Sequence, residues 1–264
     1  MTTAGRLSVV TVCKGRLHHL RQTLPTYIAQ PGVEVVVVDY GCPDGTGDWV
    51  AAHYPEARLV RLSAADFCLS RGRNRGAAAA RGNWLAFVDA DVALAPGFAE
   101  AVGAAVGSDR FLLAEPMQHD LMGTVVCPRA AFERTGGFDE AMRLWGGEDK
   151  DLYLRLHHLH GLIQGSFDAG LVSTIGHDNG QRTRFSPVAD LDLCLQINQL
   201  YRTIKLDLIR LGGGELSAEM CETLFGQVRA GVERGDRQFR LSLPDSPGTR
   251  LAVARSLVYA IGPG

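Results

Sequence analysis

Short apolar runs alternate with helix-like patterns along the first half of the chain. Residues 33–39 (VEVVVVD) form a nearly continuous β-branched run, which is typical of a parallel strand buried on both faces. The pattern predicts strands at 7–12, 33–39, 57–62 and 84–88, and helices at 17–29, 48–53 and 73–81. This alternation predicts βαβ units and therefore an α/β fold, with a mainly parallel central sheet covered by helices on both faces.

The pattern changes beyond about residue 110. Short strands are expected at 111–115 and 123–127, a helical turn at 130–134 and a helix at 150–160. Two amphipathic helices are then expected at 188–211 and 217–234. We therefore expect an α/β core over residues 1–185 and a helical C-terminal extension over residues 186–264 that packs on the core.

Composition and charge narrow the class of protein. Of 264 residues, 46% are hydrophobic and 21% charged, which excludes a disordered or collagen-like chain. The net charge of -2 lacks the excess of basic residues that is typical of proteins that bind nucleic acids. No apolar run approaches the ~18 residues of a membrane span, and the N-terminus lacks the order of a signal peptide. The six cysteines contain no CxxC pair. We expect a cytoplasmic protein, either monomeric or homodimeric.

A pair of aspartates follows the strand predicted at 84–88. Asp89 and Asp91 are separated by one residue, so an extended backbone places both carboxylates on the same side. Carboxylates at the carboxyl end of a parallel strand lie where α/β sheets bind ligands. Hard divalent cations take oxygen ligands, so the pair favours Mn²⁺ or Mg²⁺ together with a diphosphate. The alternative is an exposed strand end followed by an Asp turn.

A second strand also ends in a carboxylate. Asp39 closes the run at 33–39 and is followed by the glycine-rich segment GCPDGTG at 41–47. Such a carboxylate can accept hydrogen bonds from a nucleobase or a ribose, while glycines allow the ligand to approach closely. The alternative is an ordinary turn between a strand and a helix.

Five sequence blocks, in order, resemble the nucleotide-sugar-dependent glycosyltransferases of the GT-A fold, in particular family 2 and the galactosyltransferase C-terminal domains. The blocks are VVVDYGCPDGT, GRNRG, FVDADV, GGFDE and WGGEDKDL. The resemblance spans roughly residues 7–180. It departs from the family pattern at Tyr40, which stands where a second Asp is frequent.

The resemblance implies roles for individual residues on the donor side. Asp89 and Asp91 match the motif that holds the metal and the diphosphate, and His177 matches a further metal ligand. The residues expected to bind the nucleotide sugar are Lys14, Arg16, Asp39, Arg71, Asn74, Asp89, Trp145 and Gly147.

The block WGGEDKDL carries the catalytic expectation. In inverting relatives the aspartate of the ED pair is the general base, which makes Asp149 the expected base here, with Glu148 binding acceptor or donor hydroxyls. Trp145 offers a flat face on which a sugar can stack, and Gly147 belongs to a close-packed loop before a helix. The alternative is that these acids only stabilise the positive end of that helix.

Together these features predict a metal-dependent inverting glycosyltransferase. It would move a sugar from a nucleotide-diphosphate sugar, with a UDP-sugar favoured, to a hydroxyl of a sugar, a glycolipid or a small molecule. Two alternatives stay open: a sugar-nucleotide pyrophosphorylase, and a catalytically silent carbohydrate-binding protein on the same fold. The sequence does not name the sugar or the acceptor, since one hydroxyl contact can decide specificity.

Overall fold

The computed structural model describes residues 6–63, 66–176, 180, 184–212, 214–243 and 255–261. Its centre is a seven-stranded sheet in the order β3-β2-β1-β4-β7-β6-β8. The strands are β1 (Leu7–Cys13), β2 (Glu34–Asp39), β3 (Arg58–Arg61), β4 (Trp84–Phe87), β6 (Arg110–Glu115), β7 (Val125–Pro128) and β8 (Ile163–Asp168). All pairs are parallel except the two made by β7. Every residue of β2 is buried, as its continuous apolar run predicts.

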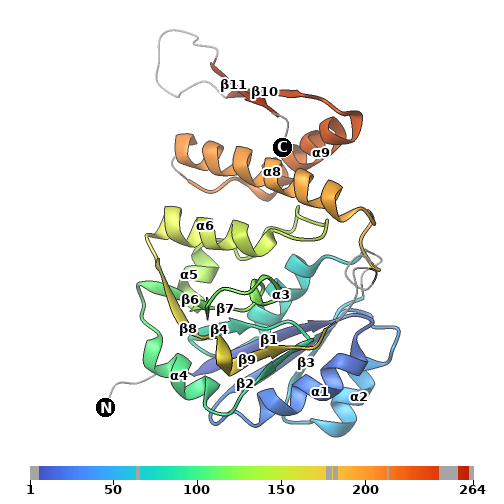
Figure 1. Ribbon diagram of the computed structural model, residues 1–264, viewed down its shortest axis with the longest axis vertical. Coiled ribbons are helices and arrows are strands. Elements are labelled where there is room, and N and C mark those ends of the chain that lie inside the picture. The colour runs from blue at the N-terminus through green and yellow to red at the C-terminus, as the bar shows by residue number, and fades with distance from the viewer. Residues whose placement is uncertain are drawn as a thin grey trace.

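Helices cover both faces of this sheet (Figure 1). On one face lie α1 (Leu17–Ile28), α2 (Thr46–His53) and α4 (Phe98–Ala105); on the other lie α3 (Leu69–Ala79), α5 (Arg129–Arg134) and α6 (Glu148–His160). Each face has its own apolar core. Leu24, Val50 and Phe98 belong to the first core, and Phe132 and Leu156 to the second. The expected α/β architecture, a mostly parallel sheet between two helical layers, is confirmed.

A further layer lies beyond α6. Helices α8 (Leu191–Gly212) and α9 (Ala218–Arg234) pack there, and the hairpin of β10 (Gln238–Leu243) and β11 (Arg255–Ala260) lies beyond them (Figure 1). Their apolar side chains form a third core that includes Met142 and Leu144 from the loop before α6. The buried ammonium of Lys205 on α8 contacts Asp139, at 2.6 Å, and Asp151 on α6, at 3.0 Å. The C-terminal part is thus tied to the core by apolar packing and by buried charge.

Several elements differ from the sequence-based expectation. Helix α3 begins at Leu69 rather than at residue 73, because Cys68 caps it by accepting a hydrogen bond from the Arg71 amide. The hairpin β10–β11, helix α4 and the small pair β5 (Val92–Leu94) with β9 (Val172–Thr174) were not expected. Segments of three to eight residues, such as β5 and α4, are too short to give a clear periodicity. Across the described ranges, no helix has both the length and the hydropathy needed to cross a membrane.

Candidate active site

A cleft of about 470 Å³ opens at the carboxyl ends of β1 and β4. Strand β1 has β2 on one side and β4 on the other, so the chain reverses its direction of winding there. This is the position at which open α/β sheets bind ligands. The opposite wall comes from the loop 142–147, from the start of α6 and from α8.

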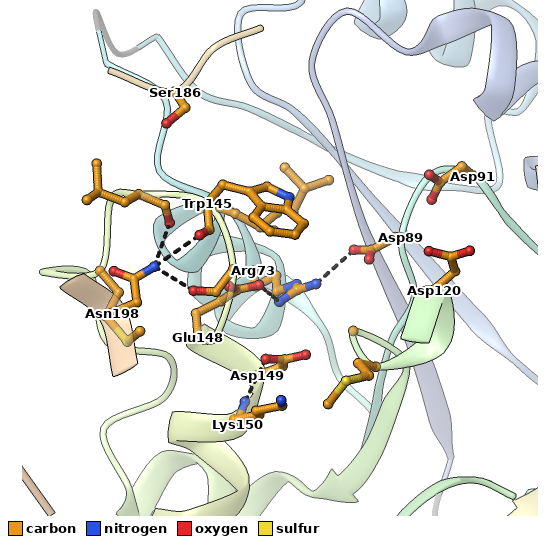
Figure 2. A pocket seen from close by; sticks show the side chains of 18 of the residues that line it. Arg73, Asp89, Asp91, Asp120, Trp145, Glu148, Asp149, Lys150, Ser186 and Asn198 are labelled. Carbon is orange, nitrogen blue, oxygen red and sulfur yellow. Dashed lines mark hydrogen bonds and ion pairs between the residues drawn. The ribbon is translucent and has the colours of Figure 1, made fainter. Parts of the chain in front are cut away.

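Of the residues predicted for the site, eight line this cleft. They are Lys14, Arg16, Asp89, Asp91, Trp145, Gly147, Glu148 and Asp149. They come from segments that lie far apart in the sequence, and the fold brings them to one opening. Figure 2 labels Asp89, Asp91, Trp145, Glu148 and Asp149 among them. His177 lies outside the described residues.

Arg73 connects the two acidic motifs of the cleft. Its guanidinium donates to Glu148 Oε1 at 2.9 Å and to Asp89 Oδ1 at 2.8 Å, as the dashed lines in Figure 2 show. The side chain is 3% exposed, and its guanidinium carbon lies 4.9 Å from the ring centroid of Phe138. A buried cation of this kind requires compensating carboxylates, which Asp89 and Glu148 supply.

The two adjacent acids at the start of α6 have perturbed acidity. Burial, together with the neighbouring Asp149, raises the pKa of Glu148 to about 7 despite the opposing effect of Arg73. Burial also raises the pKa of Asp149, although the Lys150 amide donates to its Oδ1 at 2.7 Å. Asp149 does therefore serve the first turn of the helix. However, a capping role does not require two buried neighbouring carboxyls, whereas a proton acceptor near neutral pH profits from them.

The carboxylates of Asp89 and Asp91 suit a hard divalent cation. Asp91 Oδ2 accepts from Arg16 Nη1 at 2.7 Å, and Figure 2 shows Asp120 on the same side of the pocket. Within the part of the chain that the structure describes, no three His, Cys, Asp or Glu side chains form a metal-binding group. Mg²⁺ and chemically similar ions are commonly held by one or two carboxylates plus substrate phosphates, and the aspartate pair fits that ligand set.

Three residues predicted to bind the donor have other partners here and are not among the described residues that line the cleft. Asp39 Oδ1 accepts from the Cys42 amide at 2.8 Å. Arg71 Nε donates to Glu140 at 3.2 Å. Asn74 exchanges two hydrogen bonds with the backbone of Phe138, each within 2.9 Å. Their expected contacts with a nucleotide stay a prediction.

The loop that carries Trp145 is fixed from α8. Asn198, 1% exposed, donates from Nδ2 to the carbonyls of Leu144 at 3.4 Å, Trp145 at 3.1 Å and Gly146 at 2.5 Å. Gly147 has φ of 91°, in the left-handed region that favours glycine. This arrangement aims the end of the loop, and with it Glu148, into the cleft.

Sequence reasoning missed Arg73 and Asn198. Arg73 was assigned only to an alanine-rich helix, although it lies inside the block GRNRG, where a cation near two strand-end aspartates was a usable signal. Nothing in the sequence around Asn198 marks it, because its partners are backbone carbonyls 52 to 54 residues earlier in the chain.

Cys42 is a further group whose environment the sequence does not reveal, since it belongs to no CxxC pair. Its Sγ accepts from the Thr46 hydroxyl and from the Gly15 amide, both at 3.0 Å. The hydrogen bond with Cys13 and these donors lower the pKa of Cys42 to about 5, against the effect of partial burial. We therefore expect Cys42 to be the thiolate of the pair at neutral pH, while Cys13 is fully buried and its pKa is raised.

We expect Cys42 to be the first cysteine alkylated by iodoacetamide. Because the thiolate is the reactive form, its labelling rate should be nearly constant between pH about 6 and about 8, where ordinary thiols react about tenfold faster per pH unit. Mass spectrometry of the labelled peptides measures this rate. Thr46→Ala removes one donor and should slow the labelling at the lower pH. A rate for Cys42 that climbs like that of an ordinary thiol would contradict the assignment.

Comparison with known proteins identifies the family to which this chain belongs. A family model described as glycosyl transferase family 2 matches residues 8–147, from the start of β1 to the glycine before Glu148. The chain is therefore a glycosyltransferase with the GT-A fold. It belongs to glycosyl transferase family 2. No curated protein matches the chain.

Two solved structures share this fold. The mannosyltransferase PcManGT from Pyrobaculum calidifontis, in complex with GDP-Man and Mn²⁺, aligns with a TM-score of 0.59 and 15% identity over 88% of this chain and 76% of its own. S. aureus TarS 1-349, in complex with UDP-GlcNAc, aligns with a TM-score of 0.62 and 15% identity over 86% of this chain and 73% of its own. At this identity the likeness concerns the fold alone.

Proposed function

We propose that this glycosyltransferase is metal-dependent and inverting, and that it transfers a sugar from a UDP-sugar to an acceptor hydroxyl. The observation that carries the proposal is the joining of Asp89 and Glu148 by Arg73 across one cleft. Through this link, one guanidinium contacts both Asp89, the carboxylate proposed to bind the metal, and Glu148 of the buried acid pair. The likeness to PcManGT, which was solved with Mn²⁺, adds support for a divalent cation.

The donor would lie along the β1–β4 side of the cleft. Asp89 and Asp91, with His177 as the expected further ligand, would hold Mn²⁺ or Mg²⁺, and such an ion would supply positive charge for the departing diphosphate. Lys14 and Arg16 line the same side and match the basic pair that reaches uracil and phosphates in the relatives, which favours UDP over GDP. Lys14 Nζ lies 5.3 Å from the ring centroids of both Tyr40 and Phe185, so it is oriented by cation–π contacts.

The acceptor would approach from the side of α6. Asp149 would take the proton of its hydroxyl as the oxygen attacks the anomeric carbon from the face opposite the diphosphate. Burial raises the pKa of Asp149, which strengthens it as a base compared with an exposed aspartate. Glu148 would bind sugar hydroxyls, and Trp145 offers the ring on which the sugar packs. Asp149 lies apart from the Asp89–Asp91 pair in Figure 2, as base and leaving-group sites must in an inverting displacement.

Calorimetric titration with UDP and with GDP, each with Mn²⁺ or with EDTA, tests the donor site. We expect UDP to bind only weakly without the metal, and Asp91→Asn to weaken metal-dependent binding by about tenfold or more, about 1.4 kcal/mol, since one of two carboxylate ligands is lost. Asp109→Asn, a change of the same kind on an exposed residue, is the control. Equal UDP affinity with Mn²⁺ and with EDTA would refute the metal assignment, and tighter binding of GDP would change the donor class.

A second assay separates this function from that of a sugar-nucleotide pyrophosphorylase. A transferase releases UDP from the UDP-sugar when an acceptor is present. A pyrophosphorylase instead releases pyrophosphate from a nucleoside triphosphate and a sugar phosphate. Detection of pyrophosphate under the second condition would overturn the proposal.

A further inference from the structure

One face of α8 forms a wall of the cleft. The residues Leu195, Asn198, Gln199 and Arg202 line it, at positions i, i+3, i+4 and i+7 of the helix. The adjoining face of α8, which includes Cys194, Ile197, Tyr201 and Ile204, belongs to the third apolar core. One face of helix α8 therefore packs in the third apolar core, and the face beside it, which carries three polar residues and Leu195, lines the cleft.

This wall is held rigidly against the acid pair. Asn198 binds the three carbonyls before Gly147, and Lys205 binds Asp151 one turn along α6. The contact is close: a Cβ atom at Gly147 would lie 3.1 Å from Arg202 Nη1. The guanidinium of Arg202 therefore lies over the residue directly before Glu148 and two before Asp149.

Of the six lysine and arginine side chains that line the cleft, three pair with carboxylates, and a fourth, Lys14, lies over the rings of Tyr40 and Phe185. Arg16 binds Asp91, Arg73 binds Asp89 and Glu148, and Arg143 binds Glu222. Among the described residues, no carboxylate lies within ion-pair distance of the side-chain nitrogens of Arg202 or Lys150, both of which line the cleft. Figure 2 shows Lys150 directly beside Asp149.

Arg202 is not among the charges that stabilise the acid pair, whereas Lys150 lowers the pKa of Asp149 through its charge. Arg73 already contacts Glu148 directly, and it lowers the pKa of both Glu148 and Asp149 against the effect of burial. Arg202 is half-buried, so an unpaired guanidinium there has lost part of its hydration without gaining an anion in exchange. A planar guanidinium matches the paired oxygens of a carboxylate or a phosphate, and the ammonium of Lys150, which lines the same cleft, adds a second positive charge.

We propose that Arg202, together with Lys150, binds an anionic group on the acceptor, a carboxylate or a phosphate, so that the enzyme glycosylates an acidic acceptor. The inference rests on the proposed function and names its acceptor class. With the anion held by Arg202, a hydroxyl of the same acceptor lies near Asp149. Its oxygen bonds to the anomeric carbon, its proton passes to Asp149, and the bond from that carbon to the diphosphate breaks, with the electron pair leaving on UDP.

Binding of three probes to protein saturated with UDP and Mn²⁺ tests the inference. The probes are glucose, glucuronate and glucose 6-phosphate, which present no anion, a carboxylate and a phosphate. Because UDP occupies the donor phosphate site, anion binding reports on the remaining cleft. We expect at least one anionic probe to bind about tenfold or more tightly than glucose, and its preference to fall as salt is added. The stronger of the two anionic probes identifies the anion.

Matched variants locate the contact. Arg202→Gln should reduce the affinity for the anionic probe to that for glucose, and Lys150→Gln, which changes an exposed residue, should reduce it in part. Arg229→Gln removes the same charge from a half-buried position on α9 that is not among the residues lining the cleft, and it should change nothing. Equal binding of all three probes, no binding of either anion, or an unchanged preference in Arg202→Gln would overturn the inference.

The same samples distinguish a failure of the proposed UDP site from a failure of the proposed acidic acceptor. Failure of the unmodified protein to bind UDP counts against the proposed donor site. Intact UDP binding, in the unmodified protein and in Arg202→Gln, without a preference for either anion counts against the acidic acceptor alone.

Discussion

Replacement of Asp149 by Asn should lower the rate of sugar transfer by about 10²- to 10⁴-fold, the usual contribution of a general base. An amide cannot take a proton from the acceptor hydroxyl at neutral pH. Its oxygen can still accept from the Lys150 amide, so the first turn of α6 should keep its structure. Release of UDP in the presence of acceptor measures the rate, and calorimetry should give UDP affinity within about twofold of the unmodified protein, since Asp149 is assigned to the acceptor side.

The comparison variant for Asp149→Asn is Asp109→Asn, which removes an exposed carboxylate next to β6. It should retain full activity. Turnover of Asp149→Asn close to that of the unmodified protein would eliminate Asp149 as the base. Loss of UDP binding together with turnover would instead show that Asp149 supports the donor site, a different role from the one assigned.

Replacement of Arg73 by Met should lower the free energy of unfolding by about 3–5 kcal/mol, the cost of leaving a buried charge without its partner. The guanidinium is the direct ionic partner of Glu148, and it also contacts Asp89. The loss should be greater at pH about 8 than at pH about 5, because the pKa of Glu148 is already raised to about 7 and below that pH the group is neutral. Denaturant unfolding at both pH values measures the difference.

A double-mutant cycle makes this prediction specific. Glu148→Gln removes one of the two charges that Arg73 compensates, so Arg73→Met should cost less in that background. Arg75→Met, a matched change at an exposed position of the same helix, should leave the free energy of unfolding nearly unchanged. Equal costs for Arg73→Met with and without Glu148 would show that the ion pair contributes little.

The fold was predictable where one face or both faces of an element are buried. The runs predicted as strands at 7–12, 33–39 and 84–88 correspond to β1, β2 and β4, because buried strands require continuous apolar residues. Exposed elements gave no such signal. The strand β8, with Ile163 and Gln164 exposed, pairs with β6 through its backbone, and backbone pairing leaves little trace in residue type.

The candidate site was predictable only where its residues belong to recognisable sequence blocks. Acids and glycines in ordered blocks pointed to Asp89, Asp91, Glu148 and Asp149, which the fold brings to one cleft. The arginine that joins them, and the α8 wall opposite, depend on contacts between segments more than 50 residues apart. The block GRNRG signals a cation near the aspartates, but only the fold shows that Arg73 is buried and Arg75 is exposed.

The hydrogen bonds from Asn198 to the loop at 144–146 also set a condition on biosynthesis. During synthesis, the seven strands of the central sheet, the aspartates Asp89 and Asp91, and the acid pair Glu148 and Asp149 leave the ribosome before α8. A growing chain at that stage has its carboxylates and glycine loop without the helix that fixes them. The α8 wall of the cleft is therefore completed only after residues 191–212 have been synthesised, and a nascent chain that lacks them does not have the hydrogen bonds that fix the loop at 144–146.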